Sequence, residues 1–241
     1  MRLRTRLGTQ LRPQLGMRLP AFLGAALVLC GCRALPFPDP RLEGPYGAAL
    51  AIWTRKATLY DGLETRAFAR VIYLSPEFVN AQAAEISSLR AELPDQAAQT
   101  RERLRAENAA PTLFAIVYVA DKHSNDWEQS NSVWRLALNL GLGQMRPVSV
   151  TRIERFDAEL RTLYPYLDDF SVGYLIKFPP LGAPTLMQPA LAAQPGSAGA
   201  PLEGSPGVPA GFVPTDADLT VAGALGHFDL HWKLDGTQRV E

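Results

Sequence analysis

Cysteine is the rarest residue of this sequence. Two occur among 241 residues, Cys30 and Cys32, and both lie near the N-terminus. The chain after Cys32 therefore offers no thiol for an internal disulfide or for a zinc site built on cysteines. A domain made from it must be stabilised by an ordinary hydrophobic core.

The sequence also lacks the short motifs of several enzyme classes. It contains no Gly-x-Ser-x-Gly nucleophile elbow, and the run Gly141-Leu142-Gly143 is not followed by the third glycine of a dinucleotide-binding loop. The neighbouring carboxylates Asp168 and Asp169 point apart in an extended chain, which does not suit shared acid and base catalysis. We therefore favour a protein that is not an enzyme.

The first 31 residues contain no acidic side chain and no long apolar run. Five arginines are followed by an apolar stretch from Leu19 to Leu29, which only Pro20 interrupts. This stretch is too short for a transmembrane helix, which needs about 20 residues. A basic segment followed by a short apolar one is typical of a cleaved targeting peptide. Met17-Arg18 directly precedes the apolar stretch, so the sequence leaves open whether Met1 or Met17 is the true start.

The apolar stretch ends in the run Leu29-Cys30-Gly31-Cys32. This run resembles the lipobox of bacterial lipoproteins, in which a leucine and a small residue precede the cysteine that receives a diacylglycerol group. The resemblance implies that residues 1–31 are a signal peptide and that Cys32 carries a covalent lipid, with no other cofactor expected. In that family an aspartate after the cysteine favours the inner membrane. Arg33 stands here, which favours the outer membrane, facing the periplasm.

Positive charge is not in excess. The whole chain balances 24 basic against 24 acidic residues, and loss of the five leader arginines leaves 19 basic against 24 acidic residues. A net negative chain argues against a nucleic-acid partner, because binding to phosphates requires clustered Lys and Arg. Attachment to the membrane must then come from the lipid, and an unknown envelope protein is the further partner that we expect.

The hydrophobic pattern predicts a single, mainly β domain over residues 49–241. Alternating apolar and polar residues predict strands, and a continuous apolar run predicts a buried central strand. Ser75-Pro76 and the apolar spacing behind it predict a helical insertion at about 76–107. Short strands joined by turns favour a β-sandwich, either immunoglobulin-like or C2-like. The predicted strands are 65–74, 113–120, 133–140, 147–153, 172–178 and 228–234.

Two segments of the chain are rich in proline and glycine. Residues 32–48 are predicted to be an extended tether between the lipid and the domain. Residues 179–214 consist largely of Pro, Ala and Gly, with Glu203 as the one charged residue. Such a segment cannot bury enough apolar area to offset the ordering of its backbone, so we expect a disordered loop within the domain.

One group of polar side chains crowds the segment between two predicted strands. Carboxylates in a loop at the end of a β-sandwich often bind calcium. The alternative is a hydrogen-bonded turn, which we favour because Asp and Asn readily accept hydrogen bonds from nearby backbone amides. The possible ligands are Asp121, His123, Asp126 and Glu128.

A second possible metal site lies on the last predicted strand. His227, Asp229 and His231 alternate with apolar residues and therefore share one face. Neighbours on such a face are roughly 6.5 Å apart and could chelate a zinc ion, whereas the two histidines could not share one ion without a bend. A solvated strand face explains the same alternation, and we favour it.

Four aromatic residues cluster around the segment before and within the strand predicted at 172–178. They are Tyr164, Tyr166, Phe170 and Tyr174. Such residues could line a groove for a sugar or a peptide. Aromatic residues at strand ends also seal the core of a sandwich, which is the interpretation we favour.

These observations lead to two hypotheses about function. The first is a lipid-anchored envelope lipoprotein whose β-domain binds or braces another envelope component without catalysis. The alternative is a calcium- or zinc-dependent binding protein or hydrolase that uses the loop 121–128 together with His227 or His231.

Overall fold

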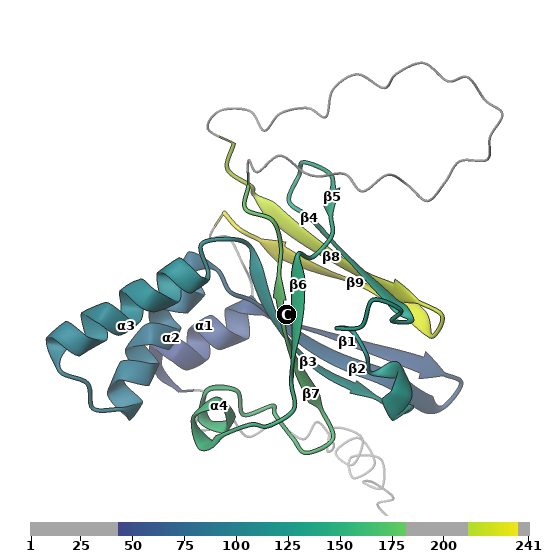
Figure 1. The fold of residues 1–241 in the computed structure, drawn as a ribbon, viewed down its shortest axis with the longest axis horizontal. Helices are drawn as coiled ribbons and strands as arrows, with labels where there is room; N and C mark the ends of the chain where they lie inside the picture. Colours follow the sequence, from purple (N-terminus) through teal and green to yellow (C-terminus); the bar gives the residue numbers. More distant parts are fainter. Residues whose placement is uncertain (1–42, 182–211, 236–241) are drawn as a thin grey trace, which may run out of the picture. The chain divides into compact units, whose positions relative to one another are not determined.

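The computed structural model describes residues 43–181 and 212–235, all of which belong to the compact unit Asp39–Glu241. These residues form two antiparallel β-sheets and four α-helices (Figure 1). The prediction of a mainly β fold with a helical insertion is confirmed. The predicted signal peptide 1–31, Cys32 and most of the predicted loop 179–214 lie outside the described residues.

The first sheet contains β1 (Thr54–Asp61), β2 (Glu64–Tyr73), β3 (Thr112–Val119), β6 (Ser149–Ile153) and β7 (Val172–Lys177). The strands lie in the order β1-β2-β3-β7-β6, and each neighbouring pair is antiparallel. Strand β3 is buried along almost its whole length. The continuous apolar run predicted this position, because a central strand is covered on both faces.

The second sheet contains β4 (Trp134–Asn139), β5 (Gln144–Met145), β8 (Asp216–Gly223) and β9 (Gly226–Lys233). The strands lie in the order β5-β4-β8-β9 and are also antiparallel. In β4 and β9 the alternate apolar residues are buried or half-buried, and most residues between them are exposed. The period of two in the sequence thus gives each strand a core side and a solvent side, as predicted.

The helices are α1 (Gly44–Trp53), α2 (Pro76–Leu89), α3 (Pro94–Glu107) and α4 (Ala158–Leu163). Helix α2 begins at the predicted cap, where the Ser75 Oγ accepts a hydrogen bond from the Phe78 amide at 3.0 Å. Helices α2 and α3 together form the predicted insertion. Most of α3 is exposed to solvent, and Thr100 is its buried residue.

Helix α1 occupies part of the segment that was predicted to be an extended tether, residues 32–48. It begins at Gly44 and buries Tyr46 and Trp53. The Tyr46 hydroxyl donates to the Leu163 carbonyl at 2.7 Å and so fixes α1 to the end of α4. Proline is compatible with the first turn of a helix, and tertiary burial outweighs the low helix propensity of this stretch. The prediction of a tether up to residue 48 is therefore wrong at its C-terminal end.

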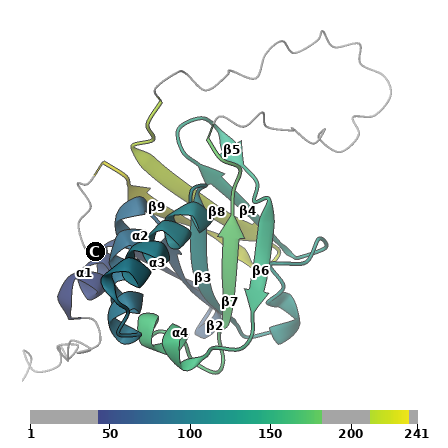
Figure 2. The ribbon, with the colours of Figure 1, turned by 60° about the vertical axis from the view of Figure 1, so that its left-hand side comes forward.

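One hydrophobic core contains buried side chains from both sheets and from the helices. We call inner the face of the five-stranded sheet that carries Tyr73 and the face of the four-stranded sheet that carries Trp232. Tyr73 of β2 and Trp232 of β9 have ring centroids 6.0 Å apart. The Trp232 indole donates to the Trp53 carbonyl at 2.8 Å. Helix α2 and the end of α4 lie on the opposite, outer side of the five-stranded sheet, and α3 packs on α2 (Figure 2). On that face Phe114 packs against Tyr164, with centroids 4.4 Å apart.

Candidate functional site

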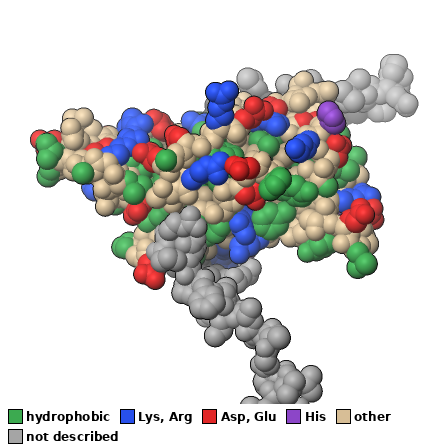
Figure 3. Space-filling view, turned by 90° about the horizontal axis from the view of Figure 1, so that it is seen from below, with side chains coloured by type: hydrophobic (Ala, Val, Ile, Leu, Met, Phe, Trp, Pro, Cys, Tyr) green, Lys and Arg blue, Asp and Glu red, His purple; other side chains and the backbone are tan. Residues whose placement is uncertain are grey.

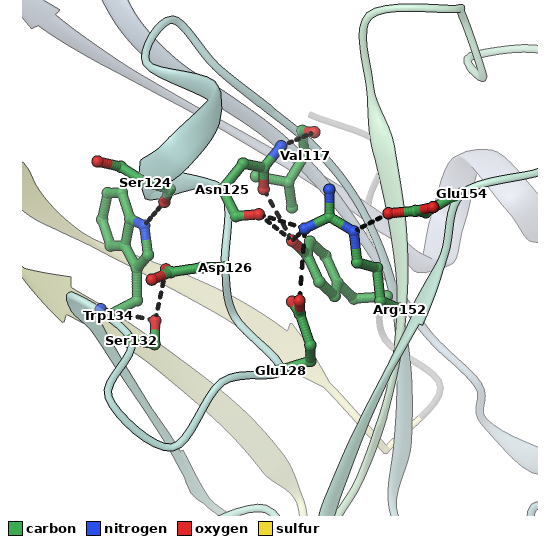
Figure 4. Close-up of polar contacts among 10 residues, drawn as sticks. Val117, Ser124, Asn125, Asp126, Glu128, Ser132, Trp134, Arg152 and Glu154 are labelled. Atoms are coloured by element: carbon green, nitrogen blue, oxygen red, sulfur yellow. Dashed lines mark hydrogen bonds and ion pairs between the residues drawn. The ribbon is translucent and has the colours of Figure 1, made fainter.

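The connection from β3 to β4 carries a polar network (Figure 4). It leaves β3 after Val119, forms a short 3-10 turn at Lys122–Ser124 and enters β4 at Trp134. Asn125 and Asp126 in this connection are buried. Buried polar groups require hydrogen-bond partners, so the contacts of this loop decide whether its polar side chains are available to a ligand.

The Asn125 side chain joins the loop to the five-stranded sheet. Its Nδ2 donates to the Val117 carbonyl at 3.1 Å, and its Oδ1 accepts from the Tyr174 hydroxyl at 3.0 Å. The same hydroxyl lies 2.9 Å from the Asn125 carbonyl oxygen. Burial raises the pKa of Tyr174, which keeps its hydroxyl a neutral donor. Trp127 stacks on the Tyr174 ring at 5.4 Å and 15°.

Arg152 reaches the same network from the edge strand β6. Its Nη1 donates to the Asn125 carbonyl at 2.5 Å and lies 3.3 Å from the Tyr174 hydroxyl. The guanidinium also forms ion pairs with Glu128 at 3.5 Å and with Glu154 at 2.9 Å. These pairs are partly exposed and contribute little to stability. The main role of Arg152 here is to position the loop through the backbone carbonyl.

The second half of the loop fixes the start of β4. The Ser132 hydroxyl donates to the Asp126 carboxylate at 2.8 Å, and the Ser132 Oγ accepts from the Trp134 amide at 3.0 Å. The Trp134 indole donates to the Ser124 carbonyl at 2.7 Å. Asp126 is therefore bound within the loop.

Replacing Ser132 by alanine should lower the free energy of unfolding by about 1–2 kcal/mol, because it leaves the buried Asp126 carboxylate and the Trp134 amide without this partner. Urea denaturation followed by tryptophan fluorescence measures the change. The control is Ser130→Ala, at an exposed position of the same loop, which should stay within about 0.5 kcal/mol. Equal effects of the two variants would contradict the assigned role of Ser132.

The possible metal ligands of the loop have separate hydrogen-bond partners. Asp121 accepts from the Ser124 hydroxyl at 2.7 Å and from the His123 amide at 3.1 Å. Both bonds lower the pKa of its carboxyl. Within 43–181 and 212–235, no three His, Cys, Asp or Glu side chains are grouped as a metal site requires. The loop has the geometry of the hydrogen-bonded turn that we favoured from the sequence.

The last strand presents His227, Asp229 and His231 on its exposed side, as the alternation predicted. The side chains of Asp229 and His231 contact residues of β8. The His231 Nδ1 lies 2.6 Å from Asp218 of β8, and the Asp229 carboxylate accepts from the Thr220 hydroxyl at 2.6 Å. The structure therefore does not bring the three predicted ligands together around one point.

The four aromatic residues predicted to line a groove are also not gathered. Tyr164 packs on the outer face of the five-stranded sheet, whereas Tyr174 belongs to the inner face. Tyr166 covers Arg70, and Phe170 is 72% exposed. Tyr164 and Tyr174 seal two sides of the same sheet, which is the role that we favoured for these residues.

Arg70 is a candidate site residue that the sequence does not mark strongly. It lies on the outer face of β2, with its guanidinium carbon 4.9 Å from the Phe68 ring centroid and 4.4 Å from that of Tyr166. Its Nε is buried without a hydrogen-bond partner. Burial lowers the pKa of the guanidinium, yet arginine stays charged in proteins. The signal in the sequence is a basic residue on the strand face that also carries Phe68 and Ile72.

Comparison with known proteins finds no family model, no curated protein and no solved structure that matches the chain. Among the described helices, none has both the length and the apolar character needed to cross a membrane.

Proposed function

We propose that this protein is an envelope lipoprotein, anchored by a lipid on Cys32, whose β-rich domain binds or braces another envelope component. The observation that carries the proposal is the run Leu29-Cys30-Gly31-Cys32 at the end of a basic and apolar leader. The resemblance to the lipobox implies the lipid on Cys32. The residue after this cysteine is Arg33 and not an aspartate, which favours the outer membrane, facing the periplasm.

The geometry of the polar residues supports a binding or structural role. In the loop after β3, the carboxylates of Asp121 and Asp126 accept hydrogen bonds from within the loop. The Tyr174 hydroxyl and Arg152 also bind this loop. Groups held in this way rigidify a domain and specify its packing.

We also propose that the two sheets form a β-sandwich. The contact between Tyr73 and Trp232 across the inner faces supports this arrangement. Trp127 belongs to the connection from β3 of one sheet to β4 of the other. Its stacking on Tyr174 supports this arrangement as well. An immunoglobulin-like or C2-like class remains the prediction made from the sequence.

Replacing Cys32 by serine should abolish lipid attachment, because a hydroxyl is a far weaker nucleophile than a thiolate. The measurement is metabolic labelling with a radioactive fatty acid, followed by separation of membrane and soluble fractions. The wild-type protein should carry the label in the outer-membrane fraction, and the variant should carry none.

Cys30→Ser is the matched control, since it changes a cysteine two residues away and leaves Gly31 and Cys32 in place. It should remain labelled and membrane-bound. If Cys30→Ser loses the label and Cys32→Ser keeps it, the lipid is attached to Cys30 and not to Cys32. An unlabelled wild-type protein would overturn the lipoprotein assignment itself.

A further inference from the structure

The outer face of the five-stranded sheet carries a surface of cations and aromatic rings, which we call the basic aromatic face. Lys56 of β1 lies opposite Arg70 of β2, and Phe68 of β2 lies opposite Tyr118 of β3. Tyr166 reaches over Arg70 from the segment after α4. The view from below shows Lys and Arg side chains among hydrophobic ones, with Asp and Glu side chains next to them (Figure 3).

The chemistry of Arg70 suits an anionic ligand. Two aromatic rings hold its guanidinium, and its buried Nε has no hydrogen-bond partner. Asp168 acts on it electrostatically, and the Asp168 Oδ1 accepts hydrogen bonds from the Phe170 and Ser171 amides. A stacked guanidinium is weakly hydrated and binds phosphate or carboxylate oxygens with its fork of donors. Lys56 adds an exposed second cation opposite it.

The N-terminal end of the described chain lies close to this face. Tyr46, in the first turn of α1, donates to the Leu163 carbonyl, and Leu163 precedes Tyr166 by three residues. The segment 33–43, between the predicted lipid and α1, can span at most about 40 Å even when fully extended. A chain of this length allows a lipid on Cys32 and the basic aromatic face to meet the same membrane.

We propose that the basic aromatic face contacts the anionic lipid headgroups of the membrane to which the chain is anchored. This inference rests on the proposed lipid attachment. Aromatic rings and basic side chains are the residues that settle at headgroup level. Each cation near an anionic surface strengthens the contact about fivefold. Such a contact is too weak to anchor a net negative protein alone. The lipid on Cys32 keeps the face at a high effective concentration near the membrane, so the contact can orient the domain on the bilayer.

The test uses the lipidated full chain, processed in the cell and reconstituted into vesicles. Once the leader is removed and Cys32 is acylated, an introduced cysteine is the one free thiol. Thr58→Cys places a fluorophore on the basic aromatic face, beside Phe68 in register. Ala222→Cys is the matched control, since it is also half-buried and lies on the outward side of β8. Quenching by brominated phosphatidylglycerol reports contact with the bilayer.

The label at position 58 should be quenched and the label at position 222 should not. Lys56→Gln and Arg70→Gln should each lower the ratio of docked to undocked protein about fivefold. Lys233→Gln removes an exposed cation from β9 and should change nothing. Lys56 is exposed, so Lys56→Gln should remain folded. This variant therefore tests the proposal even if Arg70→Gln unfolds.

Vesicle flotation separates the two ways of failing. If the protein does not float with the vesicles, the lipid anchor is wrong and this inference falls with it. If it floats but both labels are quenched equally, the anchor stands and the basic aromatic face is overturned. Equal quenching in brominated phosphatidylcholine would overturn recognition of anionic headgroups. Shielding of the label by polyglutamate but not by vesicles would assign the face to an acidic protein, which also contradicts the proposal.

Discussion

Replacing Trp232 by alanine should lower the free energy of unfolding by about 3–5 kcal/mol, the usual cost of removing a large buried aromatic side chain. Trp232 is fully buried on the inner face of β9, and its ring contacts Tyr73 of the other sheet. Its indole also donates to the Trp53 carbonyl at 2.8 Å. The substitution therefore opens a cavity between the sheets and removes a hydrogen bond that ties the end of α1 to β9.

Urea denaturation followed by far-ultraviolet circular dichroism measures this change. Trp232→Phe keeps most of the apolar ring but removes the indole donor, so it should cost less than the alanine variant, about 1–2 kcal/mol. Lys233→Ala changes the exposed neighbour and should stay within about 0.5 kcal/mol. A loss below about 1 kcal/mol for Trp232→Ala would mean that this ring does not join the two sheets.

The strands that the sequence predicts best are those with one buried face and one exposed face. In β4, Trp134 and Leu138 are buried while Arg135 between them is exposed, so the period of two is visible in the residues themselves. The helical insertion is equally readable, because Ser75 and Pro76 are local signals that act on the first turn of α2.

The elements that the sequence analysis did not predict are stabilised by contacts with residues far away in the sequence. Helix α1 has the composition of a tether, but the bond from Tyr46 to Leu163 and the burial of Trp53 stabilise it. Strand β8 directly follows the segment rich in Pro, Ala and Gly, and β1 is an edge strand with few fully buried residues. Tertiary burial outweighs local propensity in such places.

The polar sites depend even more on contacts between strands. His231 lies opposite Asp218 in the register of β8 and β9, so its partner could not be inferred without predicting β8. Arg70 and Tyr166 are brought together by the packing of the chain after α4. A pattern of alternation shows which side chains share a face, but it does not show which other strand supplies their neighbours.

Replacing Asn125 by alanine should lower the free energy of unfolding by about 2–3 kcal/mol, because one buried amide serves two partners. The Val117 carbonyl loses its bond from Nδ2, and the Tyr174 hydroxyl loses the Oδ1 acceptor. The hydroxyl retains the Asn125 backbone carbonyl at 2.9 Å, so the cost stays below that of a fully unpaired group. Denaturation in urea provides the measurement, and Gln129→Ala, exposed in the same loop, is the control.

A double-mutant cycle with Tyr174→Phe isolates the side-chain contact within this network. The two changes should be less than additive, with a coupling of about 1 kcal/mol, since both remove the hydrogen bond between Oδ1 and the hydroxyl. Tyr174→Phe keeps the ring on which Trp127 stacks, so the cycle reports the polar contact and not the packing. Additive effects would show that the hydrogen bond between Oδ1 and the hydroxyl does not contribute to stability.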